Sequence, residues 1–79
     1  MSPGIGLMKR RLGNEKDAIV LAISGVIKNY KVSEDKISTL ETKFDDNSGD
    51  WYVAIGWNEK KAIIKMDSVH GIITEIKEI

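Results

Sequence analysis

The stretch Trp51-Tyr-Val-Ala-Ile-Gly-Trp57 decides the fold, because large apolar side chains occupy every second position in it. Successive side chains of a strand point to opposite faces, so the two tryptophans share one face with Val53 and Ile55. Residues typical of turns flank the stretch on both sides, at Asp45–Asp50 and at Asn58–Lys60. The pattern therefore predicts a strand, buried on its tryptophan face, that is joined to its neighbours by hairpin turns.

Alternation continues on both sides of this strand. Residues 37–44 and 61–66 alternate in the same way, Asp67–Gly71 has turn composition, and residues 72–79 form a last strand. We therefore predict a four-stranded antiparallel β-meander. On the tryptophan face we expect Leu40, Phe44, Ala62, Ile64 and Met66, and on the opposite, mostly polar face we expect Ile63, Ile73 and Ile79.

A helix is predicted ahead of the meander. Asn14 has the side chain of a helix cap, and Asp17 places a carboxylate near the positive end of the helix dipole. An apolar stripe follows at helical spacing, and Leu21 falls on the polar side of it. Gly25 costs helix stability, which indicates that another element approaches the backbone there. The stripe consists of Ile19, Val20, Ala22, Ile23, Val26, Ile27 and Tyr30.

Together these elements predict an α+β fold, with the amphipathic helix packed on one face of the sheet as a two-layer sandwich. The chain has 79 residues, which suits one domain, and it has no cysteine to reinforce the core. Pro3 and three glycines lie in residues 1–13, so we expect a flexible N-terminal segment followed by one domain over residues 14–79. The basic cluster Lys9-Arg10-Arg11 is expected to be solvated.

Charge and hydropathy exclude several classes of function. Residues 14–79 carry nine basic and twelve acidic side chains, a balance that argues against a nucleic-acid groove. The apolar run at residues 18–23 is too short to span a bilayer. Glu15 and Asp17 lie where a secretory signal would carry no acid, and no small-residue cleavage site follows, so we predict a cytoplasmic location for the chain as given.

The sequence offers no catalytic constellation. His70 is the one histidine, and no cysteine or second histidine exists to complete a zinc site or a nucleophile pair. Asp46, Ser48 and Asp50 have the spacing with which calcium loops begin, but Trp51 replaces the glycine that should follow and no glutamate stands at the twelfth position. We therefore predict no enzyme activity and no cofactor, and we interpret Asp45–Asp50 as a hairpin loop.

The order of features resembles the PepSY domain family. The resemblance rests on the helix Asp17-Ala-Ile-Val-Leu-Ala22, the strand Trp51-Tyr-Val-Ala-Ile55, and Ile64-Lys-Met-Asp67 followed by Ser-Val-His-Gly71-Ile-Ile. It covers about residues 14–79, and a gas-vesicle accessory family shows a weaker likeness. The PepSY resemblance implies a non-catalytic module of the kind that inhibits proteases or accompanies secreted and membrane-bound enzymes, although we expect neither a signal peptide nor an attached partner domain in this chain.

From these observations we predict a small protein-binding or regulatory domain whose partner is another protein or a second copy of the chain. The alternative is a sensor of a metal ion or small ligand at the Asp45–Asp50 loop. Large aromatic side chains on a strand face fill a core, anchor a partner or stack on nucleic-acid bases. Tryptophan is enriched at binding hot spots, whereas base stacking would need flanking basic residues, which this strand does not have. The candidate contact residues are those outside the expected core, Leu21, Ile63 and Tyr52, together with Trp57.

Overall fold

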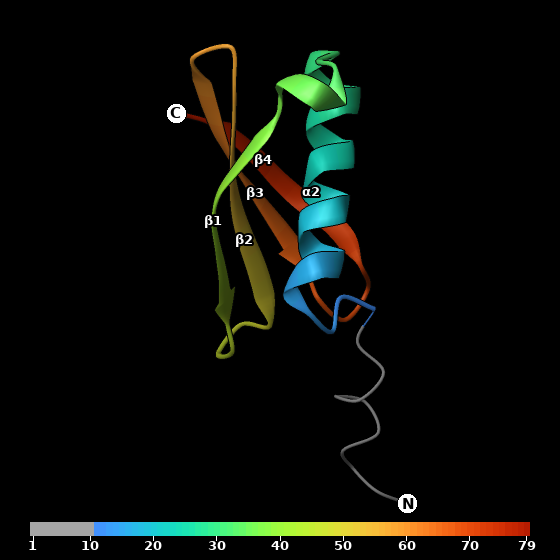
Figure 1. Ribbon diagram of the computed structural model, residues 1–79. Coiled ribbons are helices and arrows are strands. Elements are labelled where there is room, and N and C mark those ends of the chain that lie inside the picture. Colours follow the sequence, from blue (N-terminus) through green and yellow to red (C-terminus); the bar gives the residue numbers. More distant parts are fainter. Residues whose placement is uncertain (1–10) are drawn as a thin grey trace, which may run out of the picture.

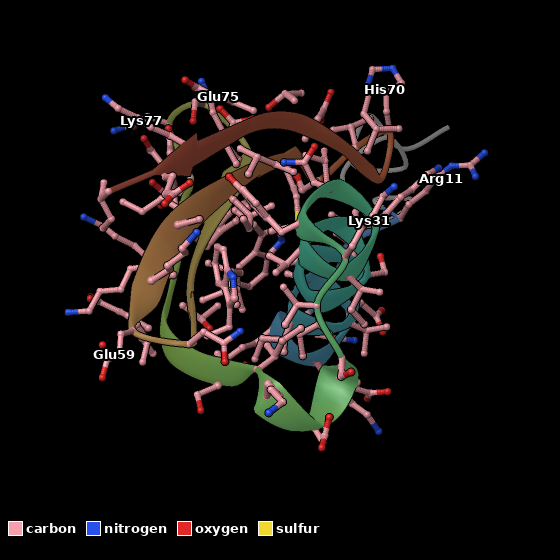
Figure 2. All side chains as sticks on the ribbon, turned by 90° about the horizontal axis from the view of Figure 1, so that it is seen from above. Arg11, Lys31, Glu59, His70, Glu75 and Lys77 are labelled. Carbon is pink, nitrogen blue, oxygen red and sulfur yellow. The ribbon has the colours of Figure 1, made fainter. Side chains whose placement is uncertain are left out.

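A computed structural model describes residues 11–79 of the chain (Figure 1). One α-helix, α2 (Glu15–Tyr30), and a 3-10 turn, η1 (Glu34–Lys36), precede a single antiparallel sheet with the strand order β1-β2-β3-β4. The helix packs on one face of this sheet, and side chains fill the space between the two layers (Figure 2). The predicted α+β two-layer fold is confirmed. The strands are β1 (Ser38–Asp45), β2 (Asp50–Trp57), β3 (Lys60–Asp67) and β4 (Ile72–Glu78).

Helix α2 begins where the sequence predicts. The Asn14 side chain accepts a hydrogen bond from the Asp17 amide at 2.9 Å, which satisfies one of the amides that the first helical turn leaves without a partner. The helix ends at Tyr30. The next residue, Lys31, caps it with a left-handed backbone, and the Lys31 amide donates to the Ile27 carbonyl at 2.8 Å.

The buried face of α2 differs from the predicted stripe. The fully buried side chains are Ala18, Ala22 and Val26, whereas Val20 is 60% exposed and Leu21 packs partly buried against the core. Both placements correct the prediction. The sheet supplies the large side chains of the core, so the helix turns its smallest residues inward and lies close to the strands.

Gly25 lies on this face, and its predicted role is confirmed. A Cβ atom at this position would collide with Cδ1 of Ile73 on β4. Ile73 therefore lies on the helix side of the sheet, and its predicted place on the opposite face is wrong. The cause is a β-bulge: Lys65 pairs with Glu75 but Met66 pairs with Ile73, so one extra residue of β4 reverses the alternation.

A second bulge corrects the prediction for Leu40. Thr39 pairs with Ile55 and Glu41 pairs with Ala54, which leaves Leu40 as the extra residue of β1. Its side chain is 51% exposed and covers Gly56, where an added Cβ would lie 3.2 Å from Leu40 Cδ1. Leu40 therefore belongs to the outer face, which is the face of the sheet opposite α2.

The core between the two layers includes residues on both sides of the predicted domain boundary. Leu12 is buried, its amide donates to the Ser68 carbonyl at 3.0 Å, and its carbonyl accepts from the Trp51 indole at 2.9 Å. The folded part thus includes Leu12 and does not begin at Asn14, because these two hydrogen bonds attach the chain to the sheet before the helix starts. Residues 1–10, with most of the predicted flexible segment, lie outside the described residues. The remaining buried apolar residues are Ala18, Ala22, Val26, Val32, Val53, Ile55, Trp57, Ala62, Ile64 and Met66.

Within residues 11–79 we find no helix that is both long and apolar enough to cross a membrane.

Candidate functional site

Strand β1 forms one edge of the sheet, and its backbone presents an open position at Thr42. Among residues 11–79, β1 pairs with β2 alone. The Ser68 amide donates to the Gly49 carbonyl at 3.0 Å, which continues the register of β2 with β3. Hydrogen-bonding direction alternates along an antiparallel strand, so the odd residues of β2 bond to β3, whereas Tyr52 and Ala54 bond to β1.

The partners of those two residues on β1 are Lys43 and Glu41. Because the direction alternates along β1 as well, the amide and carbonyl of Thr42 between them point away from the sheet. An edge strand with an open amide and carbonyl is a template for pairing with another strand.

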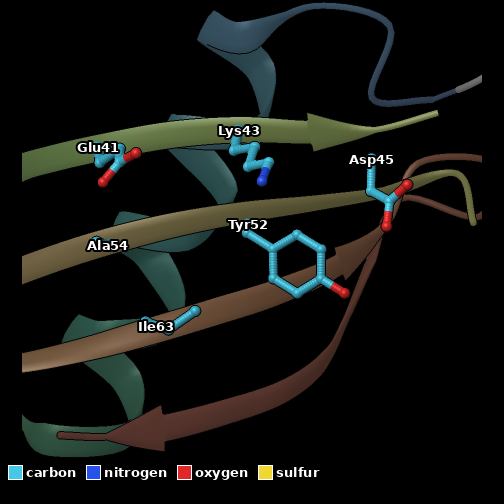
Figure 3. A pocket seen from close by; sticks show the side chains of 6 residues that line it. All are labelled: Glu41, Lys43, Asp45, Tyr52, Ala54 and Ile63. Atoms are coloured by element: carbon cyan, nitrogen blue, oxygen red, sulfur yellow. The ribbon is translucent and has the colours of Figure 1, made fainter. Parts of the chain in front are cut away.

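On the outer face, a shallow depression of about 390 Å³ adjoins this edge. Figure 3 shows the carboxylates of Glu41 and Asp45 toward its two ends and the Tyr52 ring between them. The depression is open to solvent, so it offers a surface for contact and does not enclose a small molecule. The residues that line it are Glu41, Lys43, Asp45, Tyr52, Ala54 and Ile63.

On the helix side, α2 leaves an apolar flank toward the β1 side of the sandwich. Gly25 faces β4. Ile23 and Ile27 each lie two positions from Gly25, which places them about 200° around the helix and away from β4. Both side chains are partly exposed, and together with Val20 of the helix and Glu34 of η1 they line a hollow of about 230 Å³. We call Val20, Ile23 and Ile27 the helix flank.

The structure brings together two of the four candidate contact residues. Tyr52 and Ile63 line the same depression on the outer face. Trp57 lies in the core with 5% of its surface exposed, and its ring lies 4.7 Å from that of Tyr30, so it offers little surface to a partner. Leu21 packs partly buried against the core and does not line the depression that Tyr52 and Ile63 share.

Sequence reasoning did not single out Glu41, Lys43 or Leu40 as contact residues. The available signal is the alternation Glu41-Thr42-Lys43, which places opposite charges on one face of a strand. That alternation indicates contact residues only once β1 is known to be an edge strand. In any other strand the same residues are typical of a solvated face.

His70 and Asp67 form a pair of ionisable groups in the turn between β3 and β4. The Nδ1 atom of His70 lies 2.6 Å from Oδ2 of Asp67, and Asp67 also accepts from the Val69 amide at 2.9 Å. The hydrogen bond with His70, followed by that with Val69, holds the pKa of the Asp67 carboxyl below its usual value. The His70 side chain is 71% exposed and Figure 2 shows it projecting into solvent, as expected for a turn residue.

Within residues 11–79, no nucleophile lies beside this pair. Ser68 is the neighbouring hydroxyl, but its side chain is fully buried while that of His70 lies in solvent. A nucleophile must lie within hydrogen-bond reach of its base, and these two side chains face different surroundings. The Asp67–His70 interaction therefore stabilises the turn between β3 and β4.

The polar side chains of the Asp45–Asp50 loop are accounted for by their roles in the turn between β1 and β2. Asp45 accepts from the Asn47 amide at 3.0 Å, its carbonyl accepts from the Gly49 amide at 2.8 Å, and Asp50 lies 4.0 Å from the Lys65 ammonium. Gly49 has a φ of 78°, which favours glycine. Within the part of the chain that the structure describes, no three His, Cys, Asp or Glu side chains gather to hold a metal ion.

Comparison of the chain with protein-family models, curated proteins and solved structures finds no match. The resemblance to the PepSY family therefore stays a prediction.

Proposed function

We propose that this chain is a small non-catalytic protein-binding or regulatory domain that engages its partner at the β1 edge of the sheet. The observation that carries the proposal is the open backbone position at Thr42, which has exposed apolar surface on both sides. Leu40, Tyr52 and Ile63 provide that surface on the outer face, and the helix flank provides it on the other.

Two kinds of interaction are therefore available to a partner at this edge. Main-chain hydrogen bonds to Thr42 give affinity to any extended segment, and contacts with the flanking side chains give specificity. Aromatic side chains are enriched where proteins meet, which suits the position of Tyr52 beside an open edge. The PepSY resemblance supports the same conclusion, because the family has no catalytic residues.

A proline at position 42 tests the proposal with little disturbance of the monomer. Among residues 11–79, the Thr42 amide donates to no neighbour in the sheet. Thr42→Pro therefore removes a donor that is open to a partner, and proline is tolerated at such edge positions. Thr42→Val is the matched control, because it keeps the amide and the strand preference.

The measurement is affinity capture from the native source with the wild-type chain and both variants, each checked for cooperative thermal unfolding. Two wild-type baits with different tags show whether the captured protein includes the chain itself. The proposal expects one set of bound proteins with wild type and Thr42→Val and its loss with Thr42→Pro. Equal capture by Thr42→Pro, or no capture by wild type, would contradict it.

A further inference from the structure

We infer that the partner at this edge is a second copy of the chain, joined by antiparallel pairing of β1 with β1 about Thr42. The inference rests on the proposed function and names its partner. The evidence for it is the order of charges along β1 and the direction in which its backbone groups point.

The open backbone position permits a symmetric pair. When two β1 strands run antiparallel with Thr42 opposite its own counterpart, each Thr42 amide donates to the other Thr42 carbonyl. Residues 41 and 43 then face each other as the non-hydrogen-bonded pairs, in which Cα atoms lie about 4.5 Å apart and side chains are closest. Glu41 of each copy lies opposite Lys43 of the other, so the twofold axis creates two ion pairs on the outer face.

The charges also select this register over its neighbours. An antiparallel pair centred on residue 41 sets Glu41 against Glu41, and one centred on residue 43 sets Lys43 against Lys43. Like charges directly opposite one another destabilise a strand pair. A lysine in an edge strand normally discourages pairing. In the register centred on Thr42, however, Lys43 of one copy lies opposite Glu41 of the other, so this lysine does not oppose pairing.

Strand β4 carries the same charge order at Glu75-Ile76-Lys77, and Figure 2 shows both charged side chains projecting outward from this strand. The surroundings of the two edges differ. At the β4 edge, the Ile73 side chain packs closely against the helix backbone at Gly25, so the helix and the sheet are in direct contact there. The helix flank lies on the other side and remains partly exposed.

A twofold axis through the Thr42 pair runs perpendicular to the joined sheet, so both α2 helices lie on the same face of it. The partly exposed Ile23 of each helix flank then points toward the other helix across the two β1 strands. On the outer face, Leu40 and Tyr52 of the two copies approach the axis from both sides. Burial of these apolar surfaces favours association.

Charge reversal at the two positions tests the register. Glu41→Lys alone places a lysine at position 41 opposite Lys43 of the other copy, and Lys43→Glu alone places a glutamate at position 43 opposite Glu41. We expect each variant alone to dimerise about tenfold more weakly than wild type, because two attractive pairs become repulsive. In an equimolar mixture, every facing pair is again of opposite charge, so a heterodimer should form with at least the wild-type affinity.

The matched control is the mixture of Glu75→Lys with Lys77→Glu. It has the same net charges but changes only the β4 edge, and we expect these variants to dimerise like wild type, alone or mixed. The readout is sedimentation velocity over a range of concentrations up to millimolar, with thermal unfolding of each variant at high dilution to confirm the fold.

Weakened association of the two β1 variants with recovery in their mixture supports the inference. Equal association of all variants, no recovery in the mixture, or the same pattern from the β4 variants would overturn it. A wild-type chain that stays monomeric over the whole range would also overturn it. That last result leaves the proposed function standing if the Thr42→Pro variant still loses a different captured protein.

Discussion

Replacement of Gly25 by alanine tests how the helix is seated on the sheet. Alanine in place of glycine inside a helix stabilises it by about 1 kcal/mol. Against this gain stands the collision of the new Cβ with Ile73 Cδ1. Excess volume in a packed core costs roughly 1–3 kcal/mol. Because Cδ1 is the end of a flexible side chain, we expect a net effect between no change and about 2 kcal/mol of destabilisation.

Combining Gly25→Ala with a substitution of Ile73 tests the contact more directly than Gly25→Ala alone. Ile73→Val removes the colliding atom and by itself costs about 0.5–1.5 kcal/mol. The next neighbour of the added Cβ is Ile76 Cδ1 at 3.7 Å, an ordinary van der Waals contact. In the Ile73→Val background, alanine at position 25 should therefore stabilise the protein by the full helix gain of about 1 kcal/mol.

Urea unfolding followed by far-ultraviolet circular dichroism gives the four free energies of this double-mutant cycle. We expect an interaction free energy of about 1–3 kcal/mol, with the double variant more stable than the sum of the single effects. Effects that add to within about 0.5 kcal/mol would refute the claim that Ile73 occupies the space above Gly25.

Three further predictions concern the cap and the two turns. Asn14→Ala should lower the free energy of unfolding by about 1 kcal/mol, whereas Asn14→Asp should preserve it; urea unfolding measures both. His70→Ala should raise the pKa of Asp67 toward its usual value in a carboxyl NMR titration, since the His70 hydrogen bond is the main cause of the lowered pKa. Because the folded-state pKa is lowered, the stability that Asp67 contributes is present at neutral pH and is lost as the pH falls through that pKa. The free energy of unfolding should therefore fall less steeply at acid pH in His70→Ala than in wild type. Identical pH dependence of the two proteins would contradict the pairing of His70 with Asp67. Millimolar Ca²⁺ should leave the melting temperature unchanged, and a rise that Asp46→Asn abolishes would instead restore the alternative of a cation sensor at the Asp45–Asp50 loop.

The elements of the fold follow from local patterns in the sequence. The cap at Asn14 and the strand of residues 51–57 were predicted because each depends on neighbouring residues alone. The close approach at Gly25 was predicted because glycine inside a helix costs stability. Its partner, Ile73, was not, since a bulge depends on pairing between two strands and one extra residue reverses the face of everything beyond it.

The candidate site was predictable only in part. Tyr52 and Ile63 lie on the face opposite the tryptophans, and simple alternation places them there. Leu40 was assigned to the wrong face because of the bulge in β1. Leu21 was misplaced because helical periodicity gives the width of an apolar stripe but not its centre, which the large side chains of the sheet decide here.

The central claim, that two copies meet through β1 with Glu41 opposite Lys43, has a direct chemical test because the chain has no cysteine of its own. The test mixes a Glu41→Cys variant with a Lys43→Cys variant under mild oxidation. In the mixed dimer, the two cysteines face each other at a separation that suits a disulfide, and the second pair keeps its native glutamate and lysine. Non-reducing electrophoresis should show a cross-linked dimer in the mixture and little with either variant alone. Equal cross-linking of the single variants, or cross-linking in a mixture of Glu75→Cys with Lys77→Cys and none at β1, would contradict it.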